Sequence, residues 1–556
     1  MSSEEKTAIP QSDAEKTHAL FDNDSYIARE DGVSAIYDAK SRLINEHMQN
    51  EVGFGRYQFQ LFLLTGLGWA ADNIWLQGVA IILPQIQHEL RPARVEYATL
   101  ALYVGLILGA TTWGILADLI GRKLSFNITL FIAGVFGVAS GAANNFTTLA
   151  ALIACVGFGI GGNLPVDGAI FLEHVPKSHQ WLLTLLSAWW ALGQLFASLV
   201  AWPLIGNFSC PTTVEECLKA DNMGWRYTLY TLISGGVTMV MWIMRFVVFD
   251  LQESSKFMIA KGRDEDAVKI LEHIARKNGR KITLTAEALR RVSGDTSTAA
   301  TTRFSTLEIF KNTFSEFSLY VSINPSSGKW LILAHTSRSH IKPLFQTKRL
   351  AINTSITIAL WGLIGLAYPL FNGFITLYLT TQVPDSNGTV SRVYRDYTII
   401  SILGVPGSII ACLVVDWTRK SDSKFSLGGR KLTMAVSTAL TGVFLFLFTT
   451  SRSQEAVLGY SCASGLTQNA MYGVLYAYTP EVFPAPHRGT GDALCSAFNR
   501  ITGILAPVIK IVTTNPDGSA TSSTANGPIF VAATLFLVSS VLMLLLPIET
   551  AGKAAL

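Results

Sequence analysis

From about residue 54 onward, the chain alternates between long apolar runs and short polar connections. A membrane-spanning helix needs about 20 consecutive, mostly apolar residues. Runs of this kind form two groups of six, separated by residues 251–349. The runs lie near residues 60–88, 97–117, 124–143, 147–172, 181–204 and 226–249, and then 350–380, 396–417, 431–450, 455–478, 490–513 and 527–547. The pattern predicts an all-α integral membrane protein with twelve spanning helices in two halves.

The composition supports this prediction. Only 15% of the residues are charged and the mean hydropathy is +0.36, whereas a soluble domain carries roughly 25% charged residues. The net charge of +4 is small, and no basic stripe appears outside the loops, so no nucleic-acid partner is expected. Phosphate-loop, His-Glu-x-x-His and Cys/His metal-ligand patterns are absent, which argues against an ATP-driven pump, an enzyme, a metal or another cofactor.

The polar segments complete the expected domain organisation. Residues 1–53 are acid-rich with no signal-peptide pattern, and we expect a cytosolic tail with at most a short helix around 33–46. Residues 262–279 have acids first, bases last and one apolar face, which predicts a helix docked on the underside of the bundle. Residues 319–339 look unlike the rest, and a retained intron is one hypothesis for them. The expected units are the tail 1–53, bundles 54–250 and 350–547, the cytosolic central loop 251–349 and the short cytosolic tail 548–556.

The basic residues of the short loops set the orientation, because Lys and Arg accumulate on the cytosolic side. They follow the second, eighth and tenth runs, so both termini are expected inside. Asn207 and Asn387, each in an Asn-x-Ser/Thr sequence, then become outward-facing glycosylation candidates. Cys210 and Cys217 share one outer loop, where either a disulfide or two free thiols is compatible with the sequence.

A charged motif closes the second run and returns in related form after the eighth. The first copy comprises Gly114, Asp118, Gly121, Arg122 and Lys123, and the second contains Asp416, Arg419, Arg430 and Lys431. The first copy resembles the loop signature of the major facilitator superfamily. The resemblance implies a gate in which a carboxylate at Asp118 latches the two halves on the cytosolic side, against the positive end of the eleventh helix. A plain interfacial turn with anchoring bases is the alternative.

A second pair of motifs narrows the resemblance. Glu173-His-Val-Pro follows the fourth run, and Tyr-Thr-Pro-Glu481-Val-Phe-Pro with Arg488 follows the tenth. Glu253 lies in a Gln-Glu-Ser-Ser-Lys sequence after the sixth run. These motifs resemble those of the sugar-porter and synaptic-vesicle-glycoprotein-like branches, and their amino-acid sequences are most similar to those of fungal members of the latter. Because no Arg follows Glu173, the N-half gate network departs from the family pattern.

A charge inside a predicted spanning helix is costly and marks a candidate site, and three such residues are singled out here. Asp72 lies midway along the first run, as a proton or substrate site or a structural hydrogen-bonding group. Asp167 lies in the fourth run, either in a transport cavity or as an extension of the inner charge cluster. Arg500 lies in the eleventh run, where it either holds a substrate carboxylate or pairs with Asp72 or Asp167.

Polar and aromatic residues on the same set of helices are further candidates for the cavity, although each also suits a helix-packing hydrogen bond. They are Asn163, Gln194, Tyr368, Asn372, Gln468, Asn469 and Tyr472. Trp189 and Trp190 suit packing or interfacial positions better.

Together, these patterns predict a monomeric carrier in the lipid bilayer that moves a small polar organic solute, such as an organic acid, sugar or vitamin, by alternating access. Proton symport through Asp72 and a plasma-membrane location are expected. A facilitative sugar or polyol uniporter is one alternative, and a non-transporting nutrient sensor is another. The short C-terminal tail after Pro547 favours transport over sensing.

Overall fold

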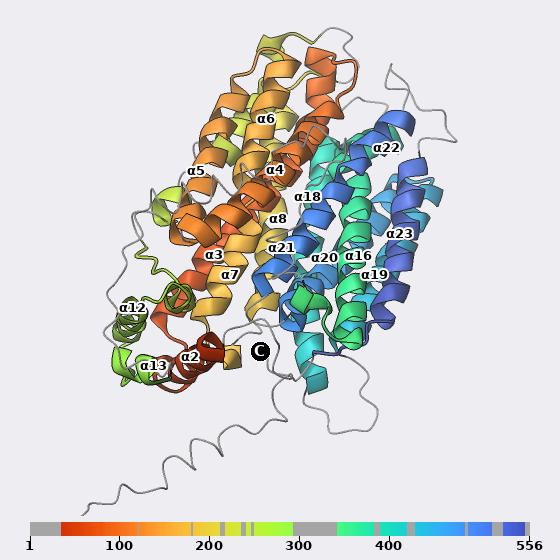
Figure 1. Cartoon of the computed structure of the whole chain (residues 1–556). Helices are drawn as coiled ribbons and strands as arrows, with labels where there is room; N and C mark the ends of the chain where they lie inside the picture. The colour runs from red at the N-terminus through yellow and green to blue at the C-terminus, as the bar shows by residue number, and fades with distance from the viewer. Residues whose placement is uncertain are drawn as a thin grey trace, which may run out of the picture.

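The computed structural model describes residues 35–292 and 342–550, except for gaps at 121, 180–181, 212–216, 235–240, 246–248, 383–389, 420–428, 484–487 and 514–525. Long helices stand side by side in two groups that follow the order of the chain (Figure 1). No β-strand occurs in the described ranges. Residues 1–34 and the unusual segment 319–339 lie outside them.

The N-terminal half (N half) contains the first six predicted spans. These are α3 (Arg56–Leu90), α4 (Tyr97–Ile120), α5 (Arg122–Gly141), α6 and α7 (Phe146–Ile160 and Asn163–His174), α8 (Leu182–Asn207), and a span that starts with α9 (Gly224–Thr228) and continues in the π-helix η5 (Leu229–Ser234). Each begins within a few residues of the predicted run.

The C-terminal half (C half) repeats this arrangement. It contains α16 (Lys348–Phe371) with η8 (Asn372–Phe374) and α17 (Ile375–Gln382), α18 (Val390–Arg419), α19 (Arg430–Thr450), α20 (Gln454–Val482), α21 and α22 (Arg488–Gly503 and Leu505–Thr513), and α23 (Gly527–Leu544). The two halves meet where α8 packs on α18 and α20, and where α4 packs on α21. The twelve-helix architecture predicted from the sequence is confirmed.

Several spans are interrupted near their middle. The fourth breaks at Gly161–Gly162, the seventh at the short η8 turn, and the eleventh at Ile504. At the first break, a Cβ on Gly162 would lie 2.4 Å from Cβ of Trp113, so a larger residue would force the helices apart. Broken helices free backbone groups at membrane depth, which is tolerated where protein or a cavity surrounds them.

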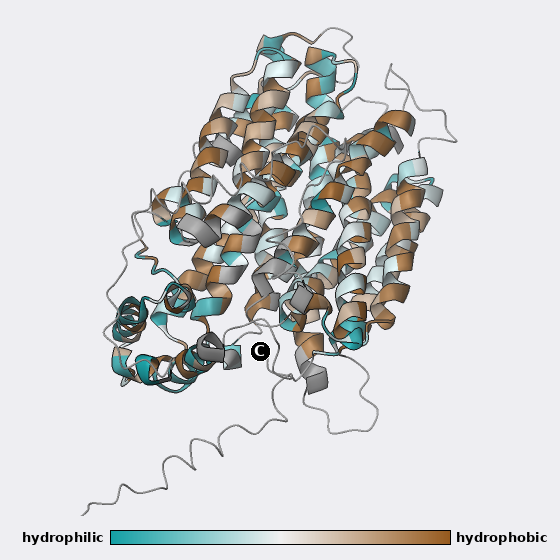
Figure 2. Ribbon diagram, in the orientation of Figure 1, coloured by the Kyte–Doolittle hydropathy of each residue, from teal (hydrophilic) through white to brown (hydrophobic). Residues whose placement is uncertain are grey.

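The surface composition agrees with a bilayer environment. In the described part of the chain, seven helices are long and apolar enough to cross a membrane by length and composition. Large apolar side chains point outward, including Leu108 on α4 and Leu413 on α18. A soluble surface seldom exposes so many. Apolar residues dominate the long helices, whereas α12 and α13 are hydrophilic (Figure 2).

Four short helices gather at one end of the N half, which we call the inner end and which the sequence predicts to be cytosolic. They are α2 (Ala35–His47), α11 (Ser255–Ala260), α12 (Asp264–Lys277) and α13 (Ala286–Val292). The expected apolar face of α12, including Leu271 and Ile274, is buried in a cluster with α2 and the start of α3. A buried ion pair joins Lys40 of α2 to Asp264 of α12 at 2.6 Å. The four helices are thus attached to the N half.

Candidate functional site

A cavity lies between the two halves and is lined by both. It has about 1090 Å³ of space free of protein atoms, including its opening. The N half contributes Trp69, Asp72, Tyr103 and Trp190, and the C half contributes Trp361, Tyr368, Tyr472, Tyr476, Asp492 and Arg500, among other residues. The lining therefore combines a wall of aromatic rings with a few charged groups from opposite halves.

Asp72 lies on α3 with 2% of its surface exposed. Its Oδ1 accepts a hydrogen bond from Nδ2 of Asn163 at 2.9 Å, and Oδ1 of Asn163 in turn accepts one from the Thr129 hydroxyl at 2.6 Å. Its Oδ2 is buried without a hydrogen-bond partner. One oxygen is therefore fixed by the N half, while the other remains available to a proton or ligand in the cavity.

Arg500 enters the cavity from α21, opposite Asp72, and is 6% exposed. It interacts electrostatically with Asp72, but the described residues form no ion pair between the two. Its Nη1 is buried without a partner. A buried guanidinium nitrogen without a partner is costly, because the protein does not replace the hydrogen bond that this nitrogen makes in water. This cost favours an anionic ligand at Arg500.

The described hydrogen bonds that connect the two halves lie on the outer side of Asp72. On α3, Gln77 Oε1 accepts from Tyr397 at 2.6 Å, and Ala80 O accepts from Thr376 at 2.6 Å. On α8, Trp202 donates to Ser391 Oγ at 3.0 Å. The cavity lining instead continues toward the inner end through Leu183, Pro480 and Asp492. The structure is therefore closed on the outer side.

Comparison with known proteins identifies the chain. The profile of the Major Facilitator Superfamily matches residues 61–428 and 397–555. The "MFS siderochrome iron transporter 1" of Ceriporiopsis subvermispora is 43% identical over 522 residues, covering 94% of this chain and 92% of that protein. The chain belongs to the major facilitator superfamily. The resemblance drawn from its motifs is confirmed, and the chain is a transporter of this superfamily, not an enzyme.

Other superfamily members agree. An uncharacterized MFS-type transporter of Schizosaccharomyces pombe is 42% identical, with 96% of this chain and 91% of that protein covered. The synaptic vesicle 2-related protein of Rattus norvegicus is 27% identical, with 90% and 80% covered. Among solved structures, the proton:xylose symporter XylE bound to 6-bromo-6-deoxy-D-glucose superposes with a TM-score of 0.62 at 14% identity, covering 90% of this chain and 98% of that one. The last similarity shows the fold.

Asp167 does not line this cavity. It forms a buried ion pair with Arg245 of the sixth span, with Nη2 and Oδ2 2.7 Å apart and both side chains 0% exposed. Arg245 also donates to Phe126 O at 3.1 Å and lies 3.6 Å from the centre of the Phe126 ring. Sequence reasoning missed Arg245, although an intramembrane charge is the signal that drew attention to Asp167.

The other polar candidates divide in two. Tyr368 and Tyr472 line the cavity. The candidate amide residues of α8 and the C half are not part of its lining. Asn372 donates a hydrogen bond to Gln468 at 2.8 Å, and Asn469 donates one to Gly465 O of its own helix at 3.1 Å. Gln194 forms a hydrogen bond with Tyr397. Trp190, which suited packing from the sequence alone, does line the cavity. The sequence could not show which helix face each of these residues occupies.

The gate motifs are partly described. In the C half, Arg430 forms an ion pair with Glu481, and Glu549 accepts hydrogen bonds from the amides of Arg430 and Lys431. In the N half, the Lys123 amide donates to Glu253 Oε2 at 3.2 Å, and Glu173 is half-buried. The structure does not describe the remaining motif residues beyond the helices that some of them belong to. These are Gly114, Asp118, Gly121, Arg122, Asp416, Arg419 and Arg488.

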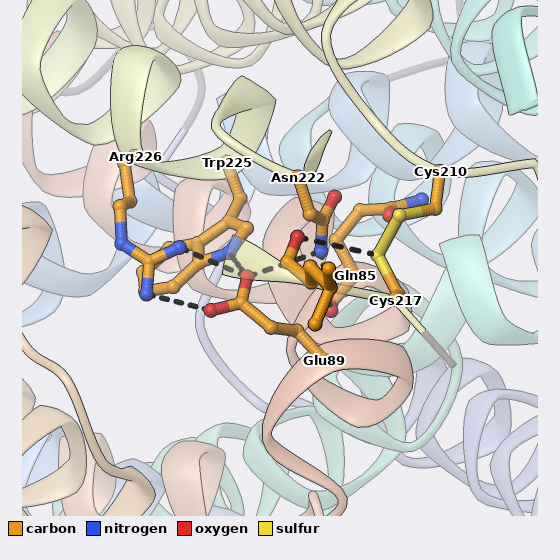
Figure 3. The surroundings of a disulfide bond; sticks show 8 residues. Gln85, Glu89, Cys210, Cys217, Asn222, Trp225 and Arg226 are labelled. Carbon is orange, nitrogen blue, oxygen red and sulfur yellow. Dashed lines mark hydrogen bonds and ion pairs between the residues drawn. A yellow bond between two sulfur atoms is a disulfide. The ribbon is translucent and has the colours of Figure 1, made fainter. Parts of the chain in front are cut away.

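The outer loop contains the Cys210–Cys217 disulfide, so the structure selects the bridge over two free thiols. Beside it, Glu89 at the outer end of α3 accepts two hydrogen bonds from Arg226, at 2.7 and 2.9 Å, and others from Trp225 and Asn222 (Figure 3). The exposed Asn207 precedes this loop, whereas Asn387 lies outside the described residues. The bridge and the buried carboxylate hold the loop against the end of the first span.

Proposed function

We propose that the chain moves a small polar organic solute by alternating access, using the cavity between its halves as the binding site. The observation that carries the proposal is the position of Asp72 and Arg500. They face one cavity from different halves, and the described residues form no ion pair between the two. Rocking of one half against the other changes the access of such a site to either side. The described contacts between the halves suit the inward-facing state of this cycle.

Proton coupling through Asp72 is the second part of the proposal. An ionised carboxylate is costly inside a membrane protein, and the free Oδ2 of Asp72 is a suitable proton acceptor. A proton on Asp72 changes its attraction for Arg500 and so couples protonation to the separation of the halves. The gate groups Glu253, Arg430 and Glu481 would stabilise the closed inner side in the outward-facing state.

The relatives do not point to a single cargo. One is named a siderochrome iron transporter, and the Arabidopsis thaliana relative, at 26% identity, is named organic cation/carnitine transporter 7. For location, we propose the plasma membrane with both termini cytosolic. The disulfide supports an oxidising environment at the outer end.

Solute-induced proton flux into proteoliposomes tests the coupling. A pH-sensitive dye in the lumen should report acidification when a transported solute is added to wild-type protein. The Asp72→Asn variant should lose this flux and pH-driven accumulation but keep solute counterflow, because exchange needs no net proton movement. Counterflow without any proton flux in the wild type would instead identify a uniporter.

A further inference from the structure

The chemistry of the cavity lining indicates which class of solute it suits. Tyr476 of α20 lies at the centre of an aromatic cluster. Its ring centroid is 4.8 Å from that of Trp69, 4.9 Å from that of Trp361 and 5.8 Å from that of Tyr472. Trp69 comes from the N half and the other rings from the C half. Offset and edge-to-face contacts with such rings favour a planar aromatic ligand.

Among the described residues, Asn499 is the one amide residue that lines the cavity, and the other amides near it already have hydrogen-bond partners. Gln77 donates to the Tyr368 hydroxyl at 2.7 Å and accepts from Tyr397 at 2.6 Å, while Asn372 and Gln468 bond each other. A polyhydroxylated solute would leave many of its hydroxyls unpaired against the aromatic wall, and unpaired buried polar groups weaken binding strongly. The lining thus disfavours a sugar or polyol.

Some lining residues from both halves have a buried polar atom without a hydrogen-bond partner, and those that the argument uses come from α21 and α3. They are Nη1 of Arg500, Oδ2 of Asp72 and the indole Nε1 of Trp69. Trp69 and Asp72 lie three residues apart on α3 and so share a helix face. By contrast, the Trp361 indole donates to the Thr479 hydroxyl at 2.9 Å. One side of the cavity therefore offers the guanidinium of Arg500, and the other side offers the indole N–H of Trp69 beside the carboxyl group of Asp72.

We propose that the cavity binds a planar aromatic carboxylate, with the carboxylate on the Arg500 guanidinium and the ring against the Trp69–Tyr476–Trp361 cluster. This rests on the proposed function of the cavity as the transport site. A guanidinium holds a carboxylate through two parallel hydrogen bonds, which a lysine cannot reproduce. Trp69 and Asp72 are placed to receive a polar substituent on the far side of the ring.

Benzoate binding to the purified full-length chain tests the proposal, followed by tryptophan fluorescence and calorimetry. Cyclohexanecarboxylate keeps the charge without the flat ring, benzamide keeps the ring without the charge, and xylose represents sugars. We expect benzoate to bind, cyclohexanecarboxylate to bind about threefold to tenfold more weakly, and benzamide and xylose to bind far more weakly than either.

Substitutions assign the contact. Arg500→Gln and Arg500→Lys should each weaken benzoate binding by about tenfold or more. Lys510→Gln is the matched control: Lys510 is a buried base in the next helix, α22, with Nζ 4.4 Å from the centre of the Tyr378 ring, and it does not line the cavity. It should leave binding unchanged. An unchanged melting temperature confirms that Arg500→Lys is folded.

The proposal is overturned if xylose binds and benzoate does not, if the two carboxylates bind equally well, or if Arg500→Lys keeps wild-type affinity. Counterflow separates this result from the proposed function. Xylose counterflow without benzoate binding would refute the solute class and leave transport intact. Benzoate binding without counterflow of any probe would support the solute class and refute the transport role of the cavity.

Discussion

Replacing Gly68 by alanine tests how the buried ion pair of the N half is accommodated. Gly68 lies on α3 directly against the Asp167–Arg245 pair. A Cβ at this position would lie 1.8 Å from Oδ2 of Asp167 and 1.9 Å from Nη2 of Arg245. The carboxylate and guanidinium would each have to move by about 1.5 Å or more to reach ordinary contact distance. Since both side chains are fully buried, neither can move into solvent.

The expected cost follows from the pair. Breaking a buried ion pair by removing one partner costs about 3–5 kcal/mol, because a buried charge is left uncompensated. Alanine recovers up to about 1 kcal/mol through its better helix propensity. We therefore expect Gly68→Ala to lower the free energy of unfolding by about 2–4 kcal/mol. Gly459→Ala on α20 is the matched control, because nothing lies within 4 Å of its added Cβ, and it should be neutral or slightly stabilising.

Reversible unfolding of the full chain in mixed micelles, followed by tryptophan fluorescence, measures both variants. The mechanism also predicts coupling. In an Asp167→Ala background, where Arg245 is free to shift, Gly68→Ala should add much less than its cost alone. Equal effects of Gly68→Ala and Gly459→Ala would refute the steric argument, and so would strictly additive costs in the double variant.

The remaining predictions concern parts of the chain outside the cavity. Replacing Cys210 and Cys217 by alanine should destabilise the protein by about 2–3 kcal/mol, measured by the same unfolding assay; non-reducing peptide mass spectrometry checks the bridge in the wild type. Burial disfavours the charged form of Glu51, but the hydrogen bonds it accepts from Thr283 outweigh this and lower its pKa below the usual 4.5. This contribution to stability is therefore present at neutral pH and lost as the pH falls through the lowered pKa. The Thr283 amide donates to Glu51 at 2.7 Å. At neutral pH, Glu51→Gln should therefore speed the hydrogen exchange of this amide relative to wild type, and the difference in exchange rate should vanish in acid. A difference in rate that persists in acid would contradict this contact.

The sequence predicted the helices well because the bilayer demands long apolar runs that can be read directly. It also placed Asp72 and Arg500 in spanning helices, where a charge is rare enough to signal function. The sequence did not predict which charged residues on different helices form ion pairs with each other. The Asp167–Arg245 pair joins residues 78 positions apart, and the Glu89–Arg226 pair joins residues 137 apart. Such pairing depends on which helix faces meet, and apolar periodicity is weak in helices that are apolar all round.

The same limit explains the amide candidates. Asn372 and Gln468 are polar residues on helices of the C half, and the sequence could not distinguish a ligand contact from a bond between neighbouring helices. The structure shows that they bond each other. Conversely, Trp190 reads as an interfacial aromatic because tryptophan favours that zone, and only the packing of α8 against α20 brings it to the cavity.

In the proposed transport cycle, two rigid halves rock about the cavity and open it alternately to each side. Distances between spin labels measure this directly, without knowledge of the solute. One pair at the outer end joins exposed Ala142 of the N half to exposed Arg452 of the C half, and one at the inner end joins Glu272 to Gln346. Ala93 with Ala142 is the control, because both lie in the N half. The cysteines outside the disulfide, Cys155, Cys412, Cys462 and Cys495, are replaced first.

In lipid nanodiscs, electron–electron double resonance should resolve two distances for each pair that joins the halves. When pH or solute shifts the populations, the outer pair should lengthen as the inner pair shortens, while the control distance stays fixed. A single unchanging distance at both ends would contradict alternating access, as would lengthening of both pairs together.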